Sequence, residues 1–158
     1  MTIATPTHPA IIDSRSGAKV AGSDKPFILA LTIGENLFEG IMRVANDAHL
    51  QAASINGLGA LDDVTVAYYN LETKQYQTQL FKGMYELISM NGNIALFEGK
   101  PFIHIHAALG TEAYDVVGGH IMDATVGPSA EITIIPLGGK MGRAFDDRTG
   151  LKLLCPIR

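Results

Sequence analysis

Residues 102–122 read FIHIHAALGTEAYDVVGGHIM, two β-prone runs that flank a short polar loop. A loop of this length and composition is typical of a β-hairpin, so the two runs are expected to pair as antiparallel strands. Successive side chains on a strand point to opposite faces, so His104 and His106 share one face. Ile103 and Ile105 lie on the other face, which is therefore expected to pack in the core.

The length of the loop also predicts the register of the hairpin. With the loop centred near Ala113, Leu109 lies opposite Val117. The same register places His106 opposite His120. Directly opposed residues hold their Cβ atoms about 4.5–5.5 Å apart, so the imidazole rings could converge on one ion. A slip of one residue would turn His120 to the opposite face.

The shared face predicts a metal site. Three neutral imidazoles without a fourth protein ligand are typical of a catalytic zinc site with one position open for water. His104, His106 and His120 are therefore candidate ligands of zinc or of another divalent transition metal, since imidazole also suits copper, nickel and iron. Gly118 and Gly119 are expected to leave open space beside them. On spacing alone, solvated histidines on the polar face of a half-buried strand are an equal alternative.

Outside this hairpin, the sequence predicts one helix, over residues 36–48, where apolar side chains recur at helical spacing. Asn36 is a favourable N-cap, and Glu39 stands where a capping box places its acidic residue. The rest is rich in β-prone segments, which predicts an α+β fold, mostly antiparallel sheet with one main helix. These segments are 27–33, 50–55, 61–70, 75–81, 85–90, 102–109, 116–126 and 131–137.

Short polar or glycine-containing segments are expected to separate the strands. Residues 70–74 are typical of a hairpin loop, and residues 56–59 of a bend or tight turn. Asn91-Gly92 fits either a hairpin turn or the end of a strand. The methionines at 84, 90 and 122 are expected to fill the core.

A chain of 158 residues fits one domain with one core. Residues 1–25 are rich in Pro, Gly, Ser and Thr, as in a flexible arm or a lightly docked strand, so the domain proper is expected over 26–137. Residues 138–158 form a glycine-rich, charged tail, expected to be loop over 138–148, with one added strand over 151–154.

Composition limits the function classes. The net charge is −4, the wrong sign for a protein held to DNA mainly by counterion release, although the tail carries Lys140, Arg143, Arg148, Lys152 and Arg158. No apolar run is long enough to span a membrane, and the single cysteine fits a reducing compartment, so a cytoplasmic protein is expected. Apolar residues make up 47% and charged residues only 18%, which favours a homo-oligomer.

Five short motifs follow one another within residues 26–137: GENLFEG at 34–40, INGLGAL at 55–61, YELIS at 85–89, HIH at 104–106 and GGH at 118–120. Their order resembles the plant and prokaryote conserved (PPC) domain family. The resemblance implies a trimer-forming α+β fold that shares its architecture with acetolactate decarboxylase, whose zinc is held by a similar pair of motifs. It thereby implies His104, His106 and His120 as ligands and a decarboxylase-like lyase as one activity.

Two further features of that resemblance bear on function. The acidic and arginine residues that the decarboxylase uses near its metal have no matching motif here. The AT-hook that plant members of the family combine with this domain is also missing, and Gly142-Arg143-Ala144 is the nearest fragment.

Glu86 is a further candidate, because a carboxylate within the apolar segment 85–90 could act as an acid, a base or an extra ligand. A salt bridge or an exposed strand face is the alternative. Three functions therefore remain open. They are a metal-dependent protein that acts on or binds a small carboxylate or carbonyl compound, a DNA-binding regulator, and a protein in which the metal only clamps a hairpin or a trimer.

Overall fold

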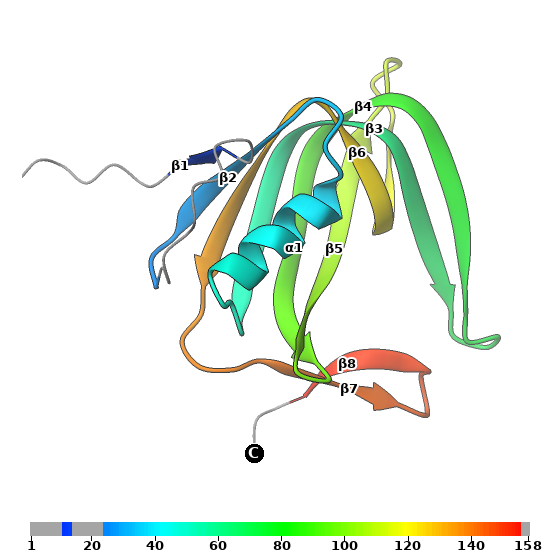
Figure 1. Ribbon diagram of the computed structural model, residues 1–158. Coiled ribbons are helices and arrows are strands. Elements are labelled where there is room, and N and C mark those ends of the chain that lie inside the picture. Colours follow the sequence, from blue (N-terminus) through cyan, green and yellow to red (C-terminus); the bar gives the residue numbers. More distant parts are fainter. Residues whose placement is uncertain (1–10, 14–23, 156–158) are drawn as a thin grey trace, which may run out of the picture.

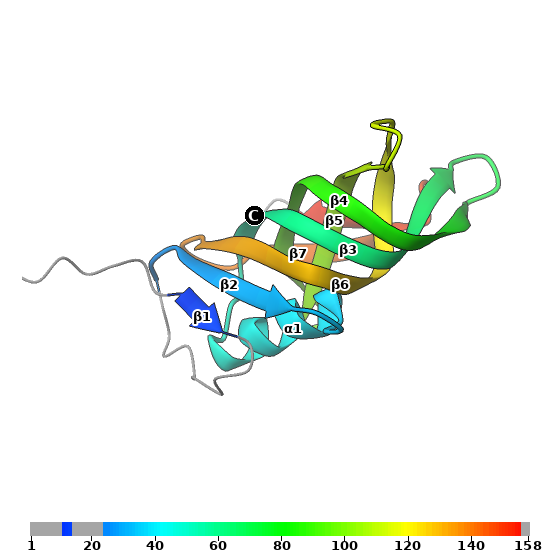
Figure 2. The same cartoon turned by 90° about the horizontal axis from the view of Figure 1, so that it is seen from above.

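The computed structural model describes residues 11–13 and 24–155 as one curved β-sheet with a helix, α1 (Leu37–Asp47), against it (Figures 1 and 2). The α+β fold, mostly antiparallel with one main helix, is confirmed. The strands of the described part are β1 Ile11–Asp13, β2 Phe27–Thr32, β3 Ala53–Asn70, β4 Gln75–Phe97, β5 Lys100–Gly110, β6 Val116–Pro136, β7 Gly142–Asp146 and β8 Leu151–Cys155.

The sheet runs in the order β1-β2-β6-β3-β4-β7-β8, and β5 pairs with both β4 and β6. Strands β3, β4, β5 and β6 therefore form a closed circuit of pairing. The β1–β2 and β4–β7 pairs are parallel, and the other pairs are antiparallel. The circuit is what brings β5 and the first part of β6 side by side.

Several predicted strands are joined in the structure. Segments 50–55 and 61–70 fall largely within β3, 75–81 and 85–90 within β4, and 116–126 and 131–137 within β6. Of the bend or tight turn predicted at 56–59, the tight turn is wrong, because these residues lie inside β3, where the pairing with β4 shifts between Gly57 and Gly59. A β-bulge absorbs the extra residue and bends the strand without ending it.

Both interpretations of Asn91-Gly92 are wrong as well. Gly92 lies within β4 and pairs with Ile105 of β5. The turn between these strands is at Glu98 and Gly99, where φ is 52° and 76°. Positive φ at both central residues matches the twist of a tight hairpin.

Helix α1 begins where the sequence predicts. The side chain of Asn36 accepts a hydrogen bond from the backbone N–H of Glu39 at 3.0 Å, and its Nδ2 donates to Oδ1 of Asp123 at 2.7 Å. The N-cap therefore also ties the helix to β6. The apolar stripe of α1 packs into the same core as Ile105 and Leu109 of β5, so the isoleucine face of the hairpin is buried as predicted.

The methionines do not all fill the core. Met90 is buried, but Met84 and Met122 are 61% and 43% exposed. Joining the β-prone segments into long strands carries parts of β4 and β6 beyond the core, where the side chains of Met84 and Met122 remain exposed among the described residues. Exposed apolar side chains on extended strands are a feature that a second subunit could cover.

The tail is more ordered than its composition predicts. The strand predicted over 151–154 is confirmed as β8, but the loop predicted over 138–148 contains β7, which pairs with β8 and meets β4 at Leu96. Most of the predicted N-terminal arm, residues 1–10 and 14–23, lies outside the described residues. In the described part, α1 is too short to cross a membrane, and no other helix could do so.

Candidate metal centre

Strands β5 and β6 pair in the predicted register. Leu109 lies opposite Val117, and His106 lies opposite His120. His104 follows two residues away on the same face of β5. The polar loop between the strands is closed by a hydrogen bond from the N–H of Thr111 to the carbonyl of Asp115, which keeps the two strands in step.

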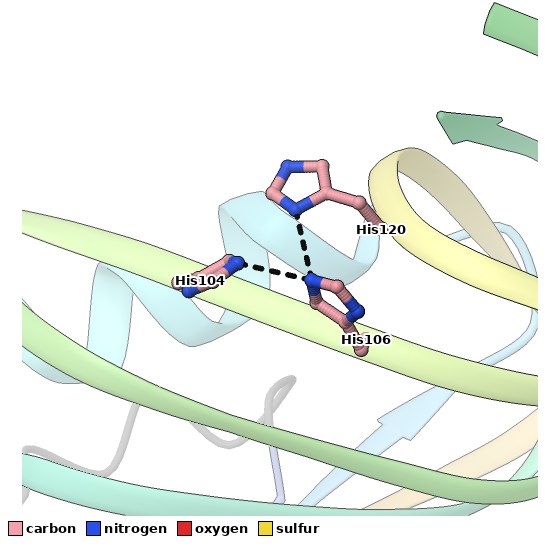
Figure 3. A group of neighbouring side chains, drawn as sticks. All are labelled: His104, His106 and His120. Atoms are coloured by element: carbon pink, nitrogen blue, oxygen red, sulfur yellow. Dashed lines mark hydrogen bonds between the residues drawn. The ribbon is translucent and has the colours of Figure 1, made fainter. Parts of the chain in front are cut away.

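The three histidine side chains point toward one another (Figure 3). Nε2 of His106 lies 3.1 Å from Nε2 of His104 and 3.4 Å from Nδ1 of His120, and the ligand atoms of all three lie within 4.8 Å of one another. Two imidazole nitrogens bound tetrahedrally to one zinc at about 2.0–2.1 Å lie about 3.3 Å apart. The three residues can therefore hold a metal ion without rearrangement of the strands.

Burial and neighbouring charges favour the neutral form of His104 and His120. His104 and His120 are half-buried, and His106 is exposed. Burial, followed by the charges of His120, Arg143 and His106, lowers the pKa of His104 to about 4. Burial, His106 and Arg143 also lower the pKa of His120. Imidazoles that are neutral at physiological pH offer free lone pairs to a cation.

The open space predicted beside the histidines does not exist. A Cβ atom on Gly118 would collide with the carbonyl oxygen of Ala107, and one on Gly92 would collide with the carbonyl oxygen of His104. The two glycines instead let β6 and β4 approach the backbone of β5 from either side. Their role is to fix the position of the strand that carries His104 and His106.

One neighbour of the site was not among the predicted residues. Arg143, on β7, places Nη2 at 3.3 Å from Nδ1 of His104. The same Nη2 donates to Oδ1 of Asn93 at 2.7 Å, and Nη1 donates to the carbonyl of Lys152 at 2.8 Å. No local pattern could have indicated this contact, because it joins positions 39 residues apart.

Polar and aromatic side chains continue the histidine face. The ring of Tyr76 on β4 lies 5.2 Å from the ring of His120, and burial raises the pKa of the Tyr76 phenol.

On the neighbouring strands, Asn91 lies opposite His106 and accepts a hydrogen bond from Asn56 at 3.0 Å. Alternation within β4 could have indicated Asn91 and Asn93, had residues 91–92 been recognised as strand.

Glu86 is not part of this cluster. It is exposed on β4 and lies opposite Gly110, four positions along β5 from His106. Within the described residues, the group of side chains that could hold a metal comprises the three histidines alone. A catalytic role for Glu86 therefore stays a prediction without a contact to support it.

The model of the Plants and Prokaryotes Conserved (PCC) domain, here called the PPC domain, matches residues 18–138. The chain belongs to this family. The family resemblance of the motifs around the histidines is thereby confirmed. No curated protein sequence matches the chain significantly.

Solved PPC-domain structures have the same fold. A metal-containing protein from Archaeoglobus fulgidus is 35% identical, covers 84% of this chain and 94% of its own, and has a TM-score of 0.79. A PPC protein from Pyrococcus horikoshii is 32% identical (85% and 93% covered, TM-score 0.78). A candidate DNA-binding protein from Ralstonia eutropha JMP134 is 30% identical (82% and 90% covered, TM-score 0.77).

The fold also resembles that of a more distant protein. A Staphylococcus aureus protein of unknown function, described as similar to α-acetolactate decarboxylase, shares it with a TM-score of 0.52 at 14% identity. The match covers 72% of this chain and 52% of that protein. The chain therefore shares its fold with a protein described as decarboxylase-like, and the likeness extends to the fold alone.

Proposed function

We propose that this PPC-domain protein binds a divalent transition metal, zinc in the first place, through His104, His106 and His120, and uses it on a small carboxylate or carbonyl compound. The observation that carries the proposal is the spacing of the three ring nitrogens, all within 4.8 Å of one another. The metal-containing relative from Archaeoglobus fulgidus supports it.

The donor set indicates what such an ion would do. Three imidazoles leave a tetrahedral ion with one position for water or a ligand oxygen, whereas a structural site uses four protein ligands. An ion bound in this way supplies Lewis-acid polarisation of a carbonyl oxygen, the chemistry that a decarboxylase-like lyase requires. The residues of the chain hold the ion at the exposed side of β5, where a small ligand has access.

Metal analysis of the purified protein tests the proposal. We expect about one equivalent of zinc in the wild-type chain and almost none in His106→Ala, because two imidazoles bind zinc much more weakly than three. His49→Ala is the matched control, since His49 lies outside the cluster and should keep full metal content. Negligible metal in the wild type, or equal metal in the wild type and His106→Ala, would contradict the proposal.

We further propose that the chain assembles as a homotrimer. The support is a set of large apolar side chains exposed on β4 and β6: Met84, Ile88, Val116 and Met122. Ile88 and Val116 both flank Gly110, so two of these side chains lie together. Analytical ultracentrifugation should give three times the mass of the chain, and a monomer at micromolar concentration would contradict this.

DNA binding is the second candidate function, supported by the description of the Ralstonia relative. Three of the tail cations that could contact phosphate already have partners in the structure. Arg143 bonds to Asn93, Arg148 to Asp146, and Lys152 lies 4.3 Å from the ring centroid of Phe97. Duplex DNA titrated at low salt and then at rising salt tests this candidate, because phosphate contacts weaken steeply with salt. An absence of binding at low salt rules out direct contact.

A further inference from the structure

The hairpin of β7 and β8 adds an element to the domain at the edge of the histidine site. It follows residue 138, where the match to the family model ends. It is anchored to β4 by the pairing of Gly142 with Leu96 and by a hydrogen bond from the N–H of Leu96 to the carbonyl of Met141 at 2.7 Å. Figure 1 shows it across the ends of β4 and β5. Its contribution to the site therefore comes from beyond the residues that the family model matches.

Its contribution is Arg143, whose guanidinium is held from several sides. Asn93 and the carbonyl of Lys152 accept its hydrogen bonds, and its Cζ lies 5.1 Å from the ring centroid of Phe102. These contacts fix the group at the edge of the metal ligands, with Nη2 3.3 Å from His104. Ordering a side chain with so many rotatable bonds costs conformational entropy, which these contacts offset.

The charge of Arg143 has no counter-ion in the chain. Among the residues that the structure describes, no carboxylate forms an ion pair with it, and its Nε is buried without a hydrogen-bond partner. Arginine remains protonated in proteins, so the site contains a partly buried positive charge beside three imidazoles. A partly buried, uncompensated charge is unfavourable, and an anionic ligand would relieve it.

The contact with His104 has a consequence for metal binding. A guanidinium has donors and no acceptor, so Arg143 donates to Nδ1 of His104, and a neutral ring then carries its proton on Nε2, the nitrogen that faces His106. A metal on Nε2 requires the opposite tautomer, with the proton on Nδ1. The two states exclude each other, so a bound metal leaves this N–H of Arg143 free for another acceptor.

We infer that Arg143 is the anion-binding residue of the site and that its ligand is a small carboxylate, with the carboxylate on the guanidinium and a neighbouring oxygen directed to the metal. The inference rests on the proposed function, because it uses the metal held by the histidines. A singly charged carboxylate matches the one guanidinium that the site offers, whereas phosphate sites usually combine several donors with a helix N-terminus.

The experiment titrates pyruvate, a small carboxylate with a neighbouring carbonyl oxygen, into the zinc-loaded full-length protein and follows binding by calorimetry. Methyl pyruvate is the uncharged analogue, and inorganic phosphate is a second oxyanion. We expect Arg143→Gln to weaken pyruvate binding by about 10-fold to 100-fold, as the loss of a charge-assisted hydrogen bond predicts, with zinc content unchanged. Arg148→Gln, on the same hairpin but exposed, should keep the wild-type affinity.

Each other outcome has a distinct meaning. A zinc-loaded wild type that does not bind pyruvate, or an Arg143→Gln variant that binds it equally well, overturns the inference and leaves the proposed function standing. Phosphate that binds as tightly, with the same dependence on Arg143, overturns the carboxylate assignment. Loss of zinc from Arg143→Gln also overturns the inference, because Arg143 would then only position His104.

Two further controls complete the design. Absence of zinc from the wild-type protein contradicts the proposed function itself, so the two failures are distinguishable. If Arg143→Gln does not fold, Arg143→Lys replaces it, because it keeps the charge and loses the planar fork. We expect about 10-fold weaker pyruvate binding for Arg143→Lys, and an unchanged affinity overturns the inference.

Discussion

The two faces of strand β5 differ in burial and in the chemistry of their side chains, although their residues alternate along one chain segment. On one face, Ile105 and Leu109 are fully buried and pack into the core with α1. On the other face, His104 is half-buried and His106 is exposed, and they lie beside His120 and Arg143. One face stabilises the fold, and the other offers donors to a ligand.

We therefore expect that single substitutions can change the stability of the fold without changing metal binding, and the reverse. Alternation places neighbouring residues about 180° apart around the strand, so a substitution on one face leaves the other face in place. Only changes that move the backbone of β5 should affect both.

Ile105→Ala should have the largest effect. The removal of a fully buried isoleucine side chain leaves a cavity and should lower the free energy of unfolding by about 2–5 kcal/mol, while the folded protein keeps its metal. Chemical denaturation and metal analysis measure the two quantities. Ile33→Ala is the control, because Ile33 is 69% exposed and should change little. A large loss of metal from folded Ile105→Ala would show that the two faces of β5 are not independent.

Metal binding should raise stability through the histidine face alone. Zinc at a hundredfold excess over its Kd should stabilise the wild type by about 2.7 kcal/mol in thermal or chemical unfolding, because only the folded state holds the three ligands together. His106→Ala should show no such gain. We expect the stripped protein to keep its assembly state. Dissociation on stripping would instead favour a metal that only clamps the subunits.

Gly118→Ala should affect both faces at once. Its Cβ would collide with the carbonyl oxygen of Ala107, so β6 must move away from β5. We expect a loss of about 1–3 kcal/mol, as for other overpacked sites, together with weaker metal binding. Gly138→Ala is the control, since nothing lies within 4 Å of a Cβ there. Unchanged metal affinity in Gly118→Ala would show that the close approach of the strands does not position the histidines.

His106→Ala should have the smallest effect on the metal-free protein. His106 is exposed and contributes nothing to the core, so the free energy of unfolding should stay within about 0.5 kcal/mol of the wild type. Equilibrium unfolding in a chelator measures this. A loss comparable to that of Ile105→Ala would mean that the histidine face also holds the fold together.

Much of the site could be predicted because it depends on local geometry. Strand alternation predicted that His104 and His106 share a face, and the loop between the strands predicted that His106 lies opposite His120. Both rules act between residues that are close in the sequence or joined by one tight loop. The helix at 37–47 with its Asn36 cap was predictable for the same reason.

The wrong predictions concern features that depend on neighbours from elsewhere in the chain. Residues 56–59 and 91–92 have the composition of turns, but β3, β4 and β5 pair across them and keep them extended. Gly118 was expected to leave space, but the backbone of β5 occupies it. Local propensity is weak compared with the hydrogen bonds of a paired strand.

From the sequence alone, the α+β fold, the hairpin register and the convergence of the three histidines could be predicted, because short-range periodicity and loop length encode them. Only the tertiary structure decided that Arg143 lies beside His104 and that Tyr76 lies beside His120. These contacts join distant segments, and their positions follow from the curvature of the sheet and the docking of the tail hairpin. No periodic pattern in one sequence encodes these two contacts, because they depend on how the whole sheet bends and closes.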